Sequence, residues 1–184
     1  MTKFNPMYKN IKDSQITISE LMLPSLSNFS GKIHGGYILN LMDQIAFACA
    51  SKHSRNYCVT ASVNKVDFLN PIDVGELVTL KASVNYTGRT SMVVGVRVES
   101  ENIQTGISKH CNSSYFTMVA KNEDGKNVAV PGLILNTEEA VRRFARSIAR
   151  QEQSKNRSNN FNASEFKIGE HLELLKLHNT KIEL

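Results

Sequence analysis

The chain has 184 residues, of which 41% are hydrophobic and 21% are charged, a composition that fits one globular domain plus a tail. The net charge of +5 favours anionic partners but does not choose among nucleic acid, anionic lipid and a phosphorylated small molecule. No stretch approaches the roughly 18 apolar residues of a membrane span, and the opening MTKFNPMYKN lacks the apolar core of a secretory signal. We therefore expect a cytoplasmic protein without a membrane span.

The cysteines and histidines argue against several classes of site. Cys49, Cys58 and Cys111 form no CxxC pair and lie in apolar or strand-like contexts, so we expect three reduced core side chains and neither a disulfide framework nor a metal. No histidine lies in a metal-like or triad-like pattern, and no serine occupies a GxSxG elbow. A serine hydrolase is therefore not expected.

A strand and then a long helix are predicted near the start of the chain. Residues 15–23, QITISELML, are strand-like up to Pro24, and SLSNFSGK has the composition of a loop. From Tyr37 to Ala50 nearly every position is apolar or small, which predicts a helix buried on most sides. Its polar residues follow a narrow stripe at helical spacing: Asn40, Asp43 and Gln44.

Four strands are predicted after this helix. They cover residues 56–69, 75–87, 90–102 and 108–121, and the turn sequences NPIDVG, TGR and IQTG separate them. The alternation in VTLKASV and MVVGVRVE suits an antiparallel sheet with one covered face. One buried helix followed by long strands predicts an α+β fold in which the sheet wraps around the central helix.

An additional helix is predicted in the C-terminal part. The segment NTEEAVRRFARSIARQEQ begins with Asn136 or Thr137 as the N-cap, and its first turn is acidic. The last segment, FKIGEHLELLKLHNTKIEL, has enough leucines for a short amphipathic helix. We therefore expect a main domain over residues 1–135, followed by a C-terminal helix and basic tail over 136–184.

Over residues 15–135 the order of elements and the motifs resemble the hotdog-fold acyl-CoA thioesterases related to the brain-type acyl-CoA hydrolase. The resemblance is carried by GKIHGGYILNLMDQIA, VTASVNKVDFLNPIDVGE, YTGRTSMVVGVRVESEN and EDGKNVAVP. It implies hydrolysis of acyl-CoA to a free fatty acid and CoA, with no cofactor apart from the coenzyme A of substrate and product. It also implies a homodimer at minimum, assembled further into a hexamer as a trimer of dimers.

Asp43 and Asn28 are the candidate catalytic side chains. A carboxylate on a largely apolar helix is costly unless it is paired or placed at a site, and partial desolvation makes it a better base. The resemblance also assigns the catalytic aspartate to Asp43, acting either as general base on water or as nucleophile. Asn28 is suited to a turn by its loop position, but the resemblance implies that it completes the site of the opposite subunit.

The start of the helix is a candidate oxyanion site. Gly35 and Gly36 serve backbone geometry or close packing in one interpretation. In the other, the N–H groups and the positive end of the helix dipole stabilise the oxyanion of the thioester, with the Gly36 backbone as the donor. His34 more often packs or caps in such a position than acts chemically, and it is retained as a substrate-binding candidate.

The phosphates of CoA require cations and backbone donors. The GRTS hairpin resembles the family's loop at the CoA nucleotide, and it supplies the leading candidates: Arg89, Thr90 and Ser91. Arg142 and Arg143 are weaker, because their helix can simply present a charged face. Thr60 and Ser62 resemble the strand beside the pantetheine tunnel, although ordinary sheet positions explain them equally well.

Three other functions are weighed. A hotdog hydratase or dehydratase is disfavoured because His34 and Asp43 do not reproduce a hydratase motif. A non-catalytic acyl-CoA or nucleotide-binding hotdog protein is compatible with the basic composition. Nucleic-acid binding is not expected, because the basic C-terminal helix lacks interleaved aromatics and glutamates dilute its charge.

Acyl-chain preference depends on the orientation of side chains such as Phe47 or Phe68.

Overall fold

The computed structural model describes residues 8–159 and 167–169. The chain divides into two compact units, residues 1–147 and 148–184, and the fold and the candidate site described below belong to the first. The amphipathic helix predicted over the last segment lies outside the described residues, apart from 167–169. Among the described residues, no helix is both long and apolar enough to cross a membrane.

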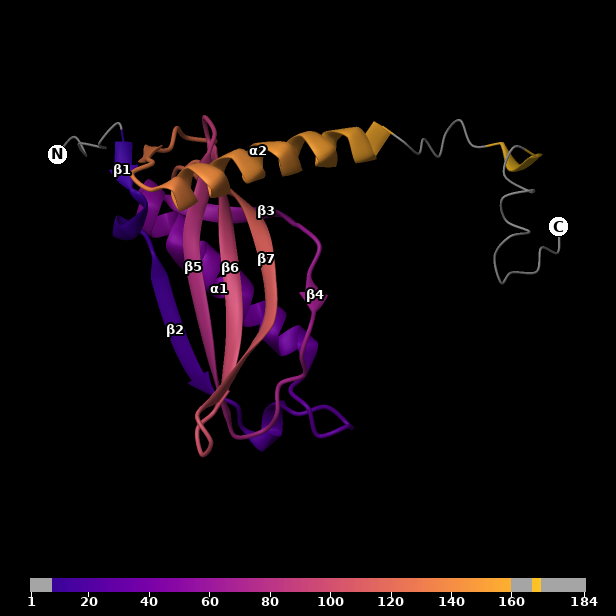
Figure 1. The fold of residues 1–184 in the computed structure, drawn as a ribbon. Coiled ribbons are helices and arrows are strands. Elements are labelled where there is room, and N and C mark those ends of the chain that lie inside the picture. The colour runs from indigo at the N-terminus through magenta and orange to yellow at the C-terminus, as the bar shows by residue number, and fades with distance from the viewer. Residues whose placement is uncertain (1–7, 160–166, 170–184) are drawn as a thin grey trace. The chain divides into compact units, whose positions relative to one another are not determined.

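A curved antiparallel sheet and one long helix make up the body of the first unit (Figure 1). The strand order is β2-β5-β6-β7-β3, with β4 paired to β7. These strands have the following bounds: β2 Ile16–Leu21, β3 Tyr57–Val63, β4 Asp67–Phe68, β5 Glu76–Thr87, β6 Ser91–Asn102 and β7 Ile107–Lys121. The helix α1, Gly35–Ser54, packs against the sheet through β5, β6, β7 and β3. The predicted α+β hotdog arrangement is confirmed.

The core lies between α1 and the sheet. On the helix, the buried apolar side chains recur at three- and four-residue intervals, which places them on one face: Ile38, Leu41, Met42, Ile45, Ala46 and Cys49. On the sheet, every second residue points to the same face, as with Val78, Leu80 and Ala82 of β5 and Val94, Val96 and Val98 of β6. The two patterns together bury one side of each layer.

Several predicted boundaries differ from the observed ones. The helix predicted from Tyr37 to Ala50 begins at Gly35 and ends at Ser54, where Arg55 adopts a left-handed φ of 59°. The single strand predicted over 56–69 is divided into β3 and β4, because the sheet pairing of β3 ends at Val63 and resumes at Asp67. A local alternation pattern does not reveal such an interruption, which depends on how the partner strand β7 bends.

Short elements that the sequence did not predict tie the chain ends of this unit together. β1, Tyr8–Asn10, pairs in parallel with β8, Gly132–Ile134. The 3-10 turns η1, Ile11–Asp13, and η2, Pro24–Leu26, flank β2. Next to β1 and β8, the fully buried His53 ring donates from Nε2 to the Pro131 carbonyl at 2.9 Å, and its Nδ1 lies 3.3 Å from the Ser14 hydroxyl.

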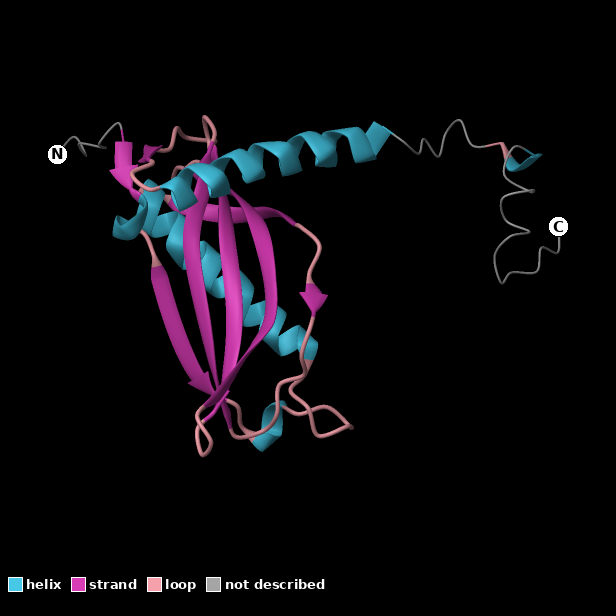
Figure 2. Ribbon diagram, in the orientation of Figure 1, coloured by secondary structure: helices cyan, strands magenta, loops and turns pink. Residues whose placement is uncertain are grey.

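The second helix, α2, spans Glu138–Asn159 and crosses the boundary between the two units (Figure 2). Thr137 is its N-cap, because the Thr137 hydroxyl accepts from the Ala140 N–H at 3.1 Å. This agrees with one of the two predicted caps. Within the first unit, the Phe144 ring packs on the Tyr86 ring of β5 with their centroids 5.0 Å apart.

Candidate functional site

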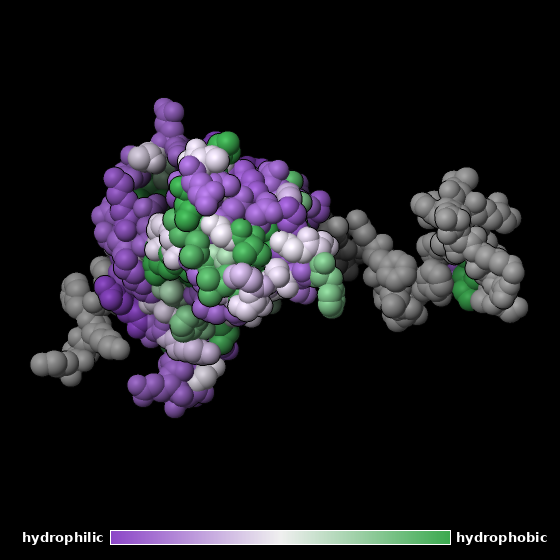
Figure 3. Space-filling view, turned by 90° about the horizontal axis from the view of Figure 1, so that it is seen from below, coloured by the Kyte–Doolittle hydropathy of each residue, from purple (hydrophilic) through white to green (hydrophobic). Residues whose placement is uncertain are grey.

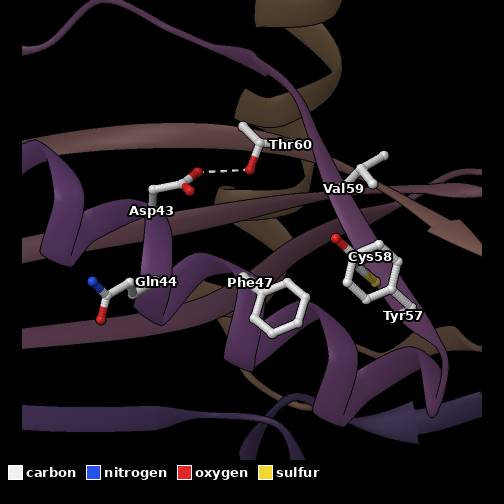
Figure 4. Close-up of a pocket in the computed structure, with 7 residues that line it drawn as sticks. All are labelled: Asp43, Gln44, Phe47, Tyr57, Cys58, Val59 and Thr60. Atoms are coloured by element: carbon white, nitrogen blue, oxygen red, sulfur yellow. Dashed lines mark hydrogen bonds between the residues drawn. The ribbon is translucent and has the colours of Figure 1, made fainter.

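The outward side of α1 and the neighbouring strand β3 enclose an open cavity of about 540 Å³ (Figure 4). Its walls combine polar and apolar side chains: Asp43, Gln44 and Phe47 of α1 and Tyr57, Cys58, Val59 and Thr60 of β3. β3 is the last strand in the sheet order, so this side of the helix is not covered by the sheet. Asp43, Gln44 and Thr60 are consequently exposed in the single chain.

Asp43 is held by Thr60 at the polar end of this cavity. The Thr60 hydroxyl donates to Asp43 Oδ1 at 2.6 Å, and Figure 4 shows the two side chains pointing toward each other across the gap between α1 and β3. Thr60 pairs with Met118, whose side chain is buried, so both residues face the helix side of the sheet. The hydrogen bond fixes one carboxylate oxygen and leaves the other able to accept a proton.

A β-bulge separates the two strand residues that the sequence grouped together. The register of β3 against β7 shifts between Thr60 and Ser62, so that Ser62 pairs with Thr117 while Thr60 pairs with Met118. Adjacent residues of a strand point to opposite faces, and the extra residue in the bulge therefore places Ser62 on the face opposite Thr60. The structure therefore brings Thr60 to Asp43 and does not bring Ser62 there. The sequence could not distinguish the two residues, because strand alternation alone does not predict the bulge.

The apolar end of the cavity is an aromatic pair. Phe47 and Tyr57 meet edge to face, with ring centroids 5.6 Å apart and an interplanar angle of 61°. Phe47 lies one helical turn after Asp43, so the carboxylate and the aromatic pair are about 6 Å apart along the helix axis. The sequence had indicated Phe47 as a residue of uncertain orientation, and it lines the cavity; Phe68 does not.

The start of α1 presents backbone donors. Tyr37 and Ile38 both donate to the His34 carbonyl, and the amides of Gly35 and Gly36 precede these first helical bonds. His34 occupies the N-cap position, but its side chain makes no capping bond. A Cβ on Gly35 would lie 3.2 Å from the Phe68 ring, whereas one on Gly36 would meet only the His34 ring at 3.6 Å. A side chain at Gly35 would therefore crowd the Phe68 ring, whereas a Cβ at Gly36 would make only an ordinary van der Waals contact.

Asn28 lies in a tight turn that precedes α1. Its Oδ1 accepts from the backbone N–H groups of Ser30 at 2.9 Å and Lys32 at 3.2 Å. Its own N–H donates to the Lys32 carbonyl at 2.7 Å. The turn-forming role considered for Asn28 is thus present in the structure, and these bonds also fix the direction of the side chain.

An ionic network that the sequence analysis missed anchors this turn. Lys32 donates to the Asp73 carboxylate, and Lys109 reaches Asp73 at 3.5 Å and Glu76 at 2.8 Å. The Lys32 hydrogen bond holds the pKa of Asp73 below its usual range. Because these residues come from separate parts of the chain, no local motif could have revealed the network.

The predicted CoA-binding residues lie at the end of the sheet nearest the cavity. Ser91 pairs with Val119, and Val119 pairs with Val59, so the β5–β6 turn is two strand spacings, about 10 Å, from the cavity wall. The exposed turn residue Arg89 and its neighbour Thr90 are anchored through their carbonyls, which accept from Val130 and Ala120.

The two candidate arginines of α2 are engaged elsewhere. Arg143 donates to Glu139 at 2.7 Å and to Ser83 at 3.4 Å, and Arg142 reaches Glu139 at 3.4 Å. These intrahelical pairs favour the interpretation of a charged helix face for both residues.

The cysteines have the predicted environment, since all three are free and buried. Burial raises the pKa of Cys49 to about 12, so its thiol is inert as a nucleophile. Within the part of the chain that the structure describes, no three His, Cys, Asp or Glu side chains are arranged to hold a metal ion.

Comparison with known proteins identifies the family. The thioesterase superfamily model matches residues 30–107. Protein VdlD of Helicobacter pylori is 42% identical over 139 residues, which cover 76% of this chain and 79% of that protein. The uncharacterized acyl-CoA thioester hydrolase YkhA of Bacillus subtilis is 34% identical over 83% of this chain and 88% of that protein. The chain belongs to the thioesterase superfamily, and the prediction of an enzyme of this class is confirmed.

Two further similarities bear on the predicted relationships. The crystal structure of an apo hexameric acyl-CoA thioesterase superposes with a TM-score of 0.82 at 38% identity, covering 85% of this chain and all of that one. The cytosolic acyl coenzyme A thioester hydrolase of rat is 32% identical over 82% of this chain, which corresponds to 40% of the rat protein. The predicted relationship to the brain-type hydrolase is confirmed.

Proposed function

We propose that this chain hydrolyses acyl-CoA to a fatty acid and CoA at a site between two protomers, with Asp43 of one and Asn28 of the other acting on the same thioester. The observation that carries the proposal is the Asp43 carboxylate held by Thr60 at 2.6 Å beside an open cavity. The relatives and the structural neighbour named as acyl-CoA hydrolases support the substrate class. The hexameric state of that neighbour supports assembly beyond a single chain.

In the proposed reaction, Asp43 removes a proton from a water molecule as the water oxygen attacks the thioester carbonyl carbon. General-base assistance of this kind contributes about 10²- to 10⁴-fold in rate. The carbonyl oxygen becomes negative, and the Gly36 N–H at the positive end of α1 stabilises it. The carbon–sulfur bond then breaks, and the CoA sulfur leaves as a thiolate or takes up the proton.

The remaining predicted residues bind the substrate in this proposal. The Asn28 side-chain NH₂ group orients the water or the carbonyl, since its Oδ1 is already used within the turn. The Arg89–Ser91 turn binds the phosphates of CoA, because it lies at the cavity end of the sheet and presents an exposed guanidinium. Arg142 and Arg143 are less favoured, because Glu139 already pairs with both.

The direct test is a thiol-release assay on acyl-CoAs from acetyl to palmitoyl. We expect turnover by the unaltered protein and a loss of about 10²-fold or more for Asp43→Asn. Asp124→Asn is the matched control, because Asp124 is an exposed carboxylate of the 122–126 turn. Equal turnover of Asp43→Asn and the unaltered protein would exclude the assignment. Tight acyl-CoA binding without any thiol release would favour the non-catalytic alternative.

A single-turnover reaction in H₂¹⁸O distinguishes the two roles left open for Asp43. Direct attack by the carboxylate forms a mixed anhydride, and hydrolysis of that anhydride at the Asp43 carbonyl carbon leaves ¹⁸O in the protein, so label in the protein identifies this route. Attack by water places the label in the fatty acid product only.

A further inference from the structure

Phe29 is the most exposed large hydrophobic side chain among the residues that the structure describes, at 113%. It occupies the tip of the Asn28–Gly31 turn, in which the Gly31 N–H donates to the Asn28 carbonyl at 3.0 Å and Gly31 has a left-handed φ of 73°. The turn therefore presents the ring outward on a fixed backbone. Removing such an apolar ring from water stabilises the assembled state, so we look for a partner surface that covers it.

The position of Phe29 next to Asn28 indicates which surface that is, and this step rests on the proposed function. In one protomer, Asp43 lies about 12 Å beyond the start of α1 along its axis. Asp43 accepts from Thr60, whereas Asn28 accepts from backbone groups of its own turn. The proposed function assigns Asn28 to the Asp43 site of a second copy of the chain, so the adjacent Phe29 would enter the same neighbourhood.

The surface around Asp43 suits an aromatic side chain. Phe47 and Tyr57 form the apolar end of the cavity and remain 38% and 62% exposed. A third ring can pack on this pair at the usual 4.5–7 Å between centroids.

More exposed apolar side chains lie on the same two elements, away from this pair. Leu39 lies one helical turn before Asp43 on α1, and Val63 lies at the far end of β3. The outer edge of β3 is the open end of the sheet, a position that readily pairs with another strand. Figure 3, seen from below, shows that hydrophobic patches lie among hydrophilic side chains on that face of the molecule.

We propose that Phe29 seats its ring against the Phe47–Tyr57 pair of a second copy of this chain. The contact positions the adjacent Asn28 beside the Asp43 of that copy. Because a two-fold interface is self-complementary, each copy inserts its own Phe29 into the other. Phe29 is thus a positioning residue, and the cavity is incomplete until the second copy supplies it.

Disulfide capture tests the contact without requiring activity. Chains carrying Phe29→Cys and chains carrying Tyr57→Cys are co-expressed with different tags and oxidised mildly; the three native cysteines are buried. We expect a covalent heterodimer that contains both tags. Ile107→Cys replaces Tyr57→Cys in the matched control, since Ile107 is 68% exposed at the start of β7. Cross-linking no greater than that of the Ile107 control would overturn the proposal.

Kinetics test the positioning role. We expect Phe29→Ala to lower kcat for acyl-CoA about 10²-fold, the cost of a small misplacement of a reacting group, with KM little changed. Phe29→Tyr keeps the ring and should retain most of kcat. Since Phe29 acts through Tyr57, adding Tyr57→Ala to Phe29→Ala should reduce kcat little further. Unchanged kcat in Phe29→Ala, or a fully additive loss in the double variant, would refute the role.

The chain contains no tryptophan, so Phe29→Trp provides a unique fluorophore. Blue-shifted emission protected from iodide is expected in the assembled protein, and emission typical of water would contradict the insertion. If the unaltered protein hydrolyses no acyl-CoA but the heterodimer forms, the proposed function fails and the Phe29 contact stands. If hydrolysis is normal but no cross-link forms, the Phe29 contact fails and the proposed function stands.

Discussion

Replacement of Thr60 by valine tests the hydrogen bond on which the site depends. Valine keeps the β-branched shape and suits a strand, but it cannot donate a hydrogen bond. In the unaltered protein, Asp43 Oδ1 accepts from the Thr60 hydroxyl at 2.6 Å. A hydrogen bond to a charged group contributes about 1.5–3 kcal/mol. Both side chains are exposed in the protomer, so the lower end applies, and about 1.4 kcal/mol corresponds to a tenfold change in rate.

We therefore expect kcat for the best acyl-CoA substrate to fall about tenfold in Thr60→Val, with a decrease of only a few degrees in the thermal midpoint from the same lost hydrogen bond. Thr60→Ser restores the hydroxyl and should recover most of the lost rate. The measurement is thiol release under saturating substrate, with thermal unfolding of each variant as the folding control. Equal kcat in the valine and serine variants would show that the hydroxyl does not orient the carboxylate during turnover.

Three further predictions concern the helix and its surroundings. Gly36→Ala keeps the backbone N–H but adds a methyl group beside it, so we expect a lower kcat from crowding of the oxyanion and no loss of stability, because the new Cβ meets no tight contact. Gly35→Ala should lower the thermal midpoint by crowding the Phe68 ring at 3.2 Å. Unfolding scans and thiol release separate the two effects. Burial lowers the pKa of His53, so the unfolded chain binds more protons than the folded chain. The unfolding free energy should therefore decrease as pH falls below about 6.5. Urea unfolding measured at several pH values checks this, and an equally strong pH dependence in His53→Gln would contradict it. Ile45 is 1% exposed, so Ile45→Ala should lower the free energy of unfolding in urea by about 2–5 kcal/mol. A decrease below about 1 kcal/mol would mean that the core collapses around the gap.

The elements with strong local patterns could be predicted closely. The run of apolar residues in α1, with Asp43 and Gln44 on its polar stripe, predicted both the helix and its outward side. The alternation in β5 and β6 predicted their bounds to within one or two residues, because their turn sequences contain glycine. The short strand β1 was missed, because its pairing with β8 joins segments more than one hundred residues apart in the sequence.

The same distinction between local patterns and long-range contacts applies to the residues of the candidate site. Asp43, Gly36 and the Arg89 turn could be proposed from the sequence because each lies in a contiguous motif that resembles a family pattern. The bulge that turns Ser62 away from Thr60, the ion pairs of Asp73 and the aromatic wall at Tyr57 were not found. Each of these depends on how β3 or the loop before α1 meets another part of the chain.

The helix, the long strands and the carboxylate that stands out on an apolar helix could all be predicted from local sequence, because hydrophobic periodicity and turn residues act over a few neighbouring positions. Three features emerge only from the folded chain: the Thr60 hydroxyl meets Asp43, an aromatic pair lines the same cavity, and Phe29 projects into solvent. These relations depend on strand register and on a bulge, and a shift of one residue moves a side chain to the other face of the sheet.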